Sequence, residues 1–196
     1  MPIHFDPVNH VYTEGDVTYR SVTQVLEELD ISDTRFYKPE HAKRGGDVHS
    51  LLRGVLTGLI KPTDLSEHPL YGYIQAAKDY LYLSNSTIIE VEKMVANRSY
   101  RIAGTIDVIL KDKNGANILV DWKTGALEGW HAVQLAGYAH LLEPEVSIDK
   151  RVIVCLSSIG AFRTHTEYRS RPFDSPEWMN IWKSAAYVSI AKRTML

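Results

Sequence analysis

Cysteine is almost missing from the 196-residue chain, which has Cys155 alone. That residue lies in VIVCLSS, a run typical of a buried strand. A single cysteine excludes a disulfide within the chain, and it excludes a zinc site or an iron–sulfur cluster held by several cysteines of one chain. We therefore expect a cytoplasmic protein.

Long apolar runs and targeting signals are also missing. No run approaches the ~18 residues of a membrane-spanning helix, and the start, MPIHFDPVNH, lacks the basic and apolar regions of a signal peptide. We expect no contact with a membrane. No repeat, low-complexity tract or G-x-x-x-x-G-K-[ST] loop occurs, so the chain supplies no P-loop motor. Hydrophobic residues make up 44% and charged residues 23%, which indicates one soluble globular domain over residues 1–196.

The charge is small overall but uneven along the chain. The net charge is −2, yet residues 150–196 carry eight Lys/Arg against three Asp/Glu, and residues 62–149 carry seven against twelve. A basic end beside an acidic middle suits a protein that binds a polyanion and collects cations at carboxylates. An ordinary solvated surface would give the same imbalance.

The hydrophobic pattern predicts an α/β fold with a mixed central β-sheet flanked by helices. HVYTEG and VTYRS predict two short strands, and Ser21 with Gln24 has the spacing of a capping box at the start of a helix. Further helices are predicted over residues 40–60, 70–83 and 131–142 and from Pro176, which follows Ser175 as N-cap. Strands are predicted over 87–95, 101–112, 116–124 and 151–158, with FRTHTEYR as an edge strand. The helix at 131–142 favours a parallel crossover between its flanking strands.

Two acids interrupt apolar strands, and their relation depends on one hairpin. Asp121 lies in ILVDWKTG and Asp107 in GTIDVIL. A two-residue Asn114–Gly115 turn would put the two acids on opposite faces of the sheet. A three-residue loop, with glycine in the left-handed position, would place them directly opposite each other, about 5 Å apart at Cβ. Two carboxylates that close repel unless a cation lies between them.

Lys123 follows Asp121 on the same strand face, about 7 Å further along. Two acids and a lysine on one face would suit a Mg²⁺ site for phosphodiester hydrolysis. A buried salt bridge between the lysine and either acid is the simpler alternative, because the D-x-K tripeptide is common.

The motifs KRGGDVHSLL, GTIDVIL, ILVDWKTG and VQLAGYAHLL, in this order, make the chain resemble the PD-(D/E)XK nucleases. More specifically, it resembles the RecB-type and phage exonuclease branch. The resemblance implies a restriction-endonuclease-like core over about residues 40–160, with the N-terminal hairpin and helix and the C-terminal helix as additions. The lack of a cysteine quartet separates the chain from the iron–sulfur nucleases that share these motifs.

The resemblance implies roles for individual residues. His49, Asp107, Asp121 and the backbone carbonyl of Trp122 would ligate Mg²⁺ or Mn²⁺, and Lys123 would be the catalytic lysine. Glu92 would support the site, with Glu90 as the competing choice. Gln134 and Tyr138, which share one helix face, would contact the substrate or steady the lysine. Basic residues expected to contact the DNA backbone are Arg44, Arg53, Arg163, Arg169 and Arg171.

The function implied is a Mg²⁺- or Mn²⁺-dependent DNA exonuclease of phage or prophage recombination, or of DNA repair. A structure- or site-specific endonuclease of the same fold and a catalytically silent DNA-binding module are the alternatives. The expected partners are DNA and, from the resemblance, a single-strand annealing protein or further copies of the chain. The expected location is the cytoplasm of a bacterial or phage-infected cell, or another intracellular compartment that contains DNA.

Overall fold

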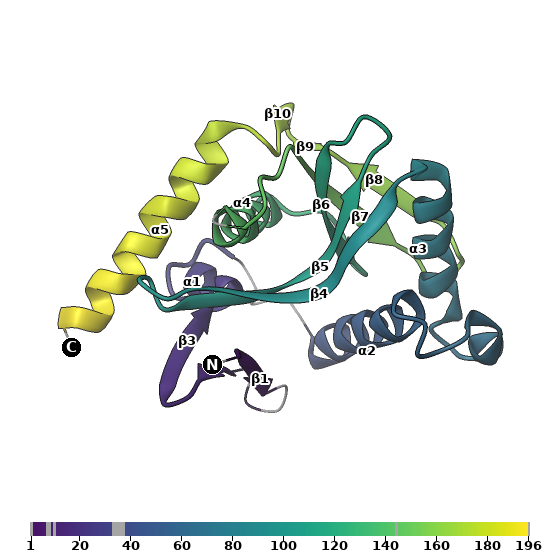
Figure 1. Cartoon of the computed structure of the whole chain (residues 1–196), viewed down its shortest axis with the longest axis horizontal. Coiled ribbons are helices and arrows are strands. Elements are labelled where there is room, and N and C mark those ends of the chain that lie inside the picture. The colour runs from purple at the N-terminus through teal and green to yellow at the C-terminus, as the bar shows by residue number, and fades with distance from the viewer. Residues whose placement is uncertain (1, 7–8, 10, 33–37, 144, 196) are drawn as a thin grey trace.

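The computed structural model of the chain describes residues 2–6, 9, 11–32, 38–143 and 145–195. Within these residues, eight strands form one mixed sheet and two more form a short ribbon. The sheet has the order β1-β2-β3-β5-β6-β7-β8, and β4 pairs with β5 (Figure 1). Its strands are β1 (His4–Asp6), β2 (Val11–Glu14), β3 (Val17–Ser21), β4 (Thr87–Asn97), β5 (Ile102–Lys111), β6 (Asn117–Lys123), β7 (Lys150–Leu156) and β8 (Phe162–His165). The predicted α/β class and mixed sheet are confirmed.

Helices cover both faces of the sheet. They are α1 (Val22–Glu27), α2 (Pro39–Leu56), α3 (Tyr71–Ser84), α4 (Trp130–Leu142) and α5 (Pro176–Met195), with a 3₁₀ helix at Pro62–Leu65. Figure 1 shows α4 and α5 on one side of the sheet and α2 and α3 on the other. None of the helices in the described ranges is both long and apolar enough to cross a membrane.

Strand β6 contributes to the core on each side of the sheet, as its alternating pattern predicts. Val120 and Trp122 pack in a buried cluster with side chains of α2 and α3. Leu119 packs in a second cluster with side chains of α1, α4 and α5. Asp121 and Lys123 belong to the Leu119 side by the two-residue period, so they point toward α4.

The hairpin between β5 and β6 has the three-residue loop. Val108 pairs with Val120, and the N–H of Asp112 donates to the carbonyl of Ala116 at 2.9 Å. Gly115 has φ of +86°, the left-handed conformation that this hairpin type places on glycine. One step beyond Val108 and Val120, the same register brings Asp107 opposite Asp121. The two-residue alternative is therefore wrong.

Other local predictions are also resolved. Ser21 and Gln24 form the capping box of α1, and β6 and β7 are parallel. His10, predicted as the first residue of a strand, lies outside the described residues.

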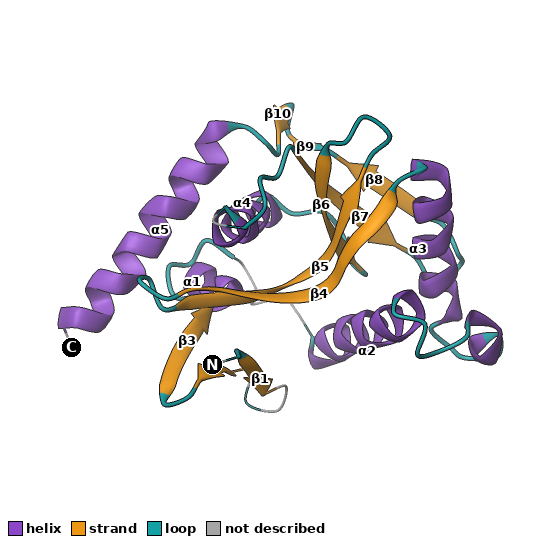
Figure 2. Ribbon diagram, in the orientation of Figure 1, coloured by secondary structure: helices purple, strands orange, loops and turns teal. Residues whose placement is uncertain are grey.

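The edge strand predicted at FRTHTEYR is wrong in part, because only β8 joins the sheet. Its remainder forms β9 (Glu167–Tyr168), which pairs with β10 (Arg171–Pro172) in the separate ribbon (Figure 2). The positive φ of Arg169 and Ser170 turns the chain between these two strands.

The first turn of α3 packs against the turn between β7 and β8, which gives a test of the fold. A Cβ at Gly72 would overlap the backbone carbonyl of Ser158, and backbone cannot move aside as a side chain can. We expect Gly72→Ala to lower the free energy of unfolding by about 2 kcal/mol or more in urea titrations.

Gly46→Ala is the matched control, because Gly46 lies within α2 and a Cβ there would meet no atom within 4 Å. We expect it to raise the free energy of unfolding by about 0.5–1 kcal/mol, since alanine favours helix. A Gly72→Ala protein as stable as wild type would contradict this packing.

Candidate active site

His49 of α2 links the helix to two strands of the sheet. Its Nδ1 lies 3.1 Å from Oδ1 of Asp107 on β5, and its Nε2 lies 3.1 Å from the backbone oxygen of Trp122 on β6. Burial lowers the pKa of His49, but the charge of Asp107 and the hydrogen bond to it outweigh burial and raise that pKa to about 9. In the metal-free protein the imidazolium therefore donates from both nitrogens.

Asp107 is held by two partners. Its Oδ2 accepts a hydrogen bond of 2.7 Å from the backbone N–H of Trp122, while its Oδ1 faces His49. Burial would raise the pKa of Asp107, but the charge and hydrogen bond of His49, the charge of Lys123 and the N–H of Trp122 together outweigh burial and lower that pKa. The carboxylate is 8% exposed and ionised, and its position is fixed by the strand beside it.

Glu92 enters this group from β4. It lies between the pairs Val91–Val108 and Lys93–Ile106, at the position opposite Asp107, and its φ is +51°. This conformation is strained for a residue other than glycine; outside turns, such strain is found at functional sites. One ligand atom each of His49, Glu92 and Asp107 lies within 4.8 Å of the others, which makes these three a candidate metal-binding group. Burial, followed by the charge of Asp107, raises the pKa of Glu92 to about 7.

Glu90, the competing candidate, lies elsewhere. Its carboxylate is 3.4 Å from the ammonium of Lys93, and its side chain is 43% exposed. The register shifts between Ile88 and Glu90, so spacing along the strand alone does not show which glutamate faces Asp107. The structure brings Glu92, and not Glu90, to the other acids.

Asp121 and Lys123 form an ion pair beside the metal-binding group. The Lys123 Nζ lies 2.6 Å from Oδ2 of Asp121. Asp121 is 3% exposed, and burial raises its pKa despite the nearby charge of Lys123. The Oδ2 atom is buried, and the Lys123 ammonium is the partner that offsets its charge. The salt bridge considered as the simpler alternative is thus present, but it lines the same cleft as His49, Glu92 and Asp107.

Gln134 connects the lysine to α4. Its Oε1 accepts a hydrogen bond of 2.9 Å from Lys123, while its Nε2 donates to Tyr138 and to Thr23 at 3.2 Å each. The two donor contacts fix the amide so that its oxygen faces the lysine. Thr23 is a site residue that sequence reasoning missed, because a threonine in a short helix carries no signal of its own. A Cβ at Gly104 would come within 2.8 Å of the Tyr138 ring, so glycine makes room for that tyrosine.

Two hollows meet at His49 and Lys123. One, of about 730 Å³, contains the acids and is lined also by Arg53 and Gln134. The other, of about 740 Å³, lies beside the start of α4 and is lined by Arg44 and His131 among others.

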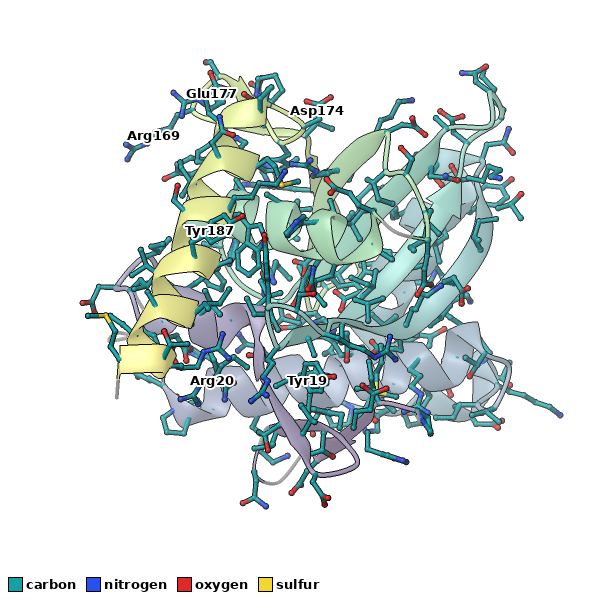
Figure 3. All side chains as sticks on the ribbon, turned by 60° about the vertical axis from the view of Figure 1, so that its left-hand side comes forward. Tyr19, Arg20, Arg169, Asp174, Glu177 and Tyr187 are labelled. Atoms are coloured by element: carbon teal, nitrogen blue, oxygen red, sulfur yellow. The ribbon has the colours of Figure 1, made fainter. Side chains whose placement is uncertain are left out.

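The remaining predicted arginines do not line these two hollows. Arg163 is exposed on β8, in a cross-strand row with Cys155 and Lys123. Arg169 and Arg171 stack on Tyr168 and Trp178 at the ribbon, and Figure 3 shows Arg169 projecting outward near the start of α5.

The donor set fits a small divalent cation. Carboxylate oxygens and an imidazole are ligands that Mg²⁺ and Mn²⁺ accept, and the carbonyl of Trp122 faces the same histidine. The three neighbouring carboxylates of Glu92, Asp107 and Asp121 also gain from a cation electrostatically. The arrangement can therefore bind a metal ion next to a lysine.

His131 provides a test of the packing beside this site. Burial, followed by the charge of Lys123, lowers the pKa of His131 to about 2. The folded state then stays neutral at a pH where the unfolded chain takes up a proton, so stability is full above the ordinary pKa of 6.5 and falls as the pH falls below it. From pH 6.5 to pH 5 we expect the free energy of unfolding of wild type, measured in urea titrations, to fall by about 2 kcal/mol relative to that of His131→Asn.

His68→Asn is the matched control. Both histidines accept a backbone N–H at Nδ1, from Glu128 and from Leu70 respectively, but His68 is exposed. We expect the pH-dependent loss to be larger for the comparison that involves His131, because His131 is buried and His68 is exposed. If wild type lost the same stability relative to His131→Asn as relative to His68→Asn over this range, His131 would not be neutral and buried in the folded protein.

Comparison with known proteins identifies the family. The chain matches the family model of the PD-(D/E)XK nuclease superfamily over residues 25–177, a range that includes His49, Glu92, Asp107, Asp121 and Lys123. No curated protein matches it. Among solved structures, the one described as the crystal structure of SSO0001 is 16% identical, with a TM-score of 0.34, and the match covers 85% of this chain and 84% of that one. Because the family model covers more than half of its length, the chain belongs to the PD-(D/E)XK nuclease superfamily, which indicates a metal-dependent nuclease.

Proposed function

We propose that the protein is a Mg²⁺- or Mn²⁺-dependent deoxyribonuclease that hydrolyses phosphodiester bonds as an exonuclease. The observation that carries this proposal is the cleft in which the group of His49, Glu92 and Asp107 adjoins the pair of Asp121 and Lys123. A module that only binds DNA has no need of buried carboxylates, since these repel phosphate. The catalytically silent alternative is therefore disfavoured.

In this proposal the ion is held by side chains from three elements and by one carbonyl. Asp107, Asp121 and His49 would be ligands together with the Trp122 oxygen, and Glu92 would bind directly or through a water. When bound, the ion polarises a phosphoryl oxygen and makes a water more acidic. His49 must give up a proton to become a ligand, because its pKa of about 9 keeps it charged in the metal-free protein.

Lys123 supplies positive charge at the reacting phosphate. Its ammonium is held between Asp121 and Gln134, so it can reach an adjacent phosphate without a large change of conformation. There it would stabilise the charge that develops on phosphoryl oxygens, or orient the attacking water. The water oxygen forms a bond to phosphorus and the bond to one sugar oxygen breaks, which leaves a phosphate on one product and a hydroxyl on the other.

The exonuclease assignment rests on the motifs that resemble the RecB-type and phage exonuclease branch. The same motifs support a role in phage or prophage recombination or in DNA repair, and association with a single-strand annealing protein or with further copies of the chain. An endonuclease of the same fold would use the same cleft. The substrates in the following experiment separate these two activities.

Cleavage should require both the divalent ion and Lys123. We expect the protein to degrade linear DNA in Mg²⁺ and not in EDTA, and we expect Lys123→Met to lower the rate at least 100-fold, because one stabilising charge at the phosphate is lost. Lys113→Met, in the exposed hairpin loop, is the control and should cleave like wild type. Nicking of closed circles would favour the endonuclease. Absence of divalent-dependent cleavage on linear and circular DNA, single- and double-stranded, would overturn the proposal.

Ion binding can be measured without DNA. In calorimetric titrations with Mn²⁺ we expect Glu92→Gln to weaken binding about 10-fold or more, since a carboxylate at or beside the ion is lost. Glu90→Gln is the matched control on the same strand and should bind like wild type. Equal Mn²⁺ affinities of the two variants would show that Glu92 does not serve the ion.

A further inference from the structure

The hollow beside the start of α4 has a different chemistry from the cleft that holds the acids. We call it the tryptophan hollow; its walls include Arg44 and His41 of α2, Thr124 and Gly125 after β6, and Trp130 and His131 of α4. It contacts the site at His49 and Lys123, and Glu92, Asp107 and Asp121 do not line it. Its volume of about 740 Å³ is within the range of small-molecule sites.

Arg44 has hydrogen-bonding capacity left in this hollow. Its Nη2 donates to the carbonyl of Thr124 at 3.3 Å, and its Nε is buried without a hydrogen-bond partner among the described residues. A buried guanidinium donor that lacks an acceptor is unfavourable. Phosphate and carboxylate groups can each accept several guanidinium donors at once, and phosphate is the group that a nuclease substrate carries.

Trp130 forms an aromatic wall that is held in place by its neighbours. Its Nε1 donates to Glu128 at 2.9 Å, and its ring meets the ring of His131 at 4.1 Å between centroids. The indole has no second donor, so what it offers a ligand is apolar ring surface. The Lys123 ammonium, 5.8 Å from the ring centroid, places this surface next to the reacting phosphate.

Two acidic residues in the wall do not prevent the hollow from binding an anionic group. Glu27 and Glu128 also line the hollow, and the carboxylate of Glu128 is engaged by the Trp130 N–H. The ligand expected here has an aromatic ring and an anionic group a short distance apart. A nucleotide has both.

We propose that the tryptophan hollow holds an unpaired nucleotide of the strand that is cut, with the base against Trp130 and its phosphate against Arg44. This inference rests on the proposed nuclease function and specifies its substrate as single-stranded at the site. A base in a duplex is covered by its neighbours on both faces, so it cannot stack on a side chain without leaving the duplex. The low exposure of Asp107 and Asp121, 8% and 3%, agrees with a flexible strand that enters the site.

Binding of single-stranded DNA provides the first test. The probe is a fluorescein-labelled 12-residue oligothymidylate in buffer that contains Ca²⁺, and binding is measured by fluorescence anisotropy. A gel checks that the probe keeps its full length during the measurement. We expect Trp130→Ala to weaken binding about 5- to 100-fold, because a base–aromatic stack is lost, and Trp130→Phe to stay within about 3-fold of wild type. Tyr82→Ala, which removes an aromatic side chain that is 85% exposed on α3, is the control and should have no effect. Wild-type affinity of Trp130→Ala would overturn the proposal.

The salt dependence separates the phosphate contact from the base contact. We expect Arg44→Met to reduce the slope of log affinity against log salt concentration by about 0.7, the value for one phosphate contact on a single strand. Trp130→Ala should leave this slope unchanged. A slope unaffected by Arg44→Met would remove the phosphate from the proposal.

A change in the DNA tests the stack without relying on any variant to fold. In a series of oligothymidylates with a single abasic residue, we expect one position to weaken binding to wild type as much as Trp130→Ala does, and to cause no further loss in that variant. Equal affinity for all abasic positions would overturn the stack. A 12-base-pair duplex with closed hairpin ends should bind wild type and Trp130→Ala equally. If Trp130→Ala lost as much affinity for this duplex as for the single strand, the proposal that the nucleotide is unpaired would be overturned.

The outcome for the inference is distinct from the outcome for the proposed function. Cleavage of DNA in Mg²⁺ together with unchanged binding by Trp130→Ala overturns the tryptophan hollow alone. Absence of cleavage by wild type overturns the nuclease, even where Trp130→Ala and the abasic series show that the hollow binds a base.

Discussion

The contacts of the Asp107 carboxylate hold the candidate site together. One oxygen accepts the backbone N–H of Trp122 on the neighbouring strand, and the other faces His49 on α2. His49 in turn reaches the Trp122 carbonyl, so the three residues form a closed set of contacts between a helix and two strands. A buried carboxylate is costly unless it is paired and hydrogen-bonded, and here it has both kinds of partner. The same contacts orient the carbonyl and the imidazole that would serve an ion.

The charged forms of Glu92 and Asp121, the two acids beside Asp107, are less well stabilised than that of Asp107. The pKa values of Glu92 and Asp121 are raised, chiefly by burial, and Glu92 also has a positive φ. In the metal-free state each of these features opposes folding. A structural salt bridge would need only one acid and Lys123. A cluster with three acids is better explained by a cation that offsets their repulsion, as the family membership indicates.

The sequence was sufficient where local rules decide the structure. The two-residue alternation of β6 sent Trp122 and Asp121 to opposite faces, as predicted. The hairpin loop was left open, because Gly115 suits a two-residue and a three-residue loop alike. The residue pattern alone did not decide between Glu92, which the resemblance implied, and Glu90, because the register shift before Glu90 and the positive φ at Glu92 leave no mark in that pattern. The role of Thr23 could not be predicted from the sequence either, since its contact with Gln134 joins residues 111 positions apart. Trp130 was not singled out because it directly precedes the segment that carried the helical motif.

Helix α4 joins the two halves of the site. Its Gln134 receives the Lys123 ammonium on the side of the acids, and Trp130, one turn earlier, lies beside the same ammonium on the other side. A shift of this helix would therefore move the lysine contact and the aromatic wall together. Two glycines limit such a shift, because Gly104 lets Tyr138 pack closely on β5 and Gly129 lets Tyr168 pack at the start of α4. The geometry of the lysine and the shape of the tryptophan hollow are thus set by one packed helix, which in the proposed complex would couple the position of the base to the position of the phosphate.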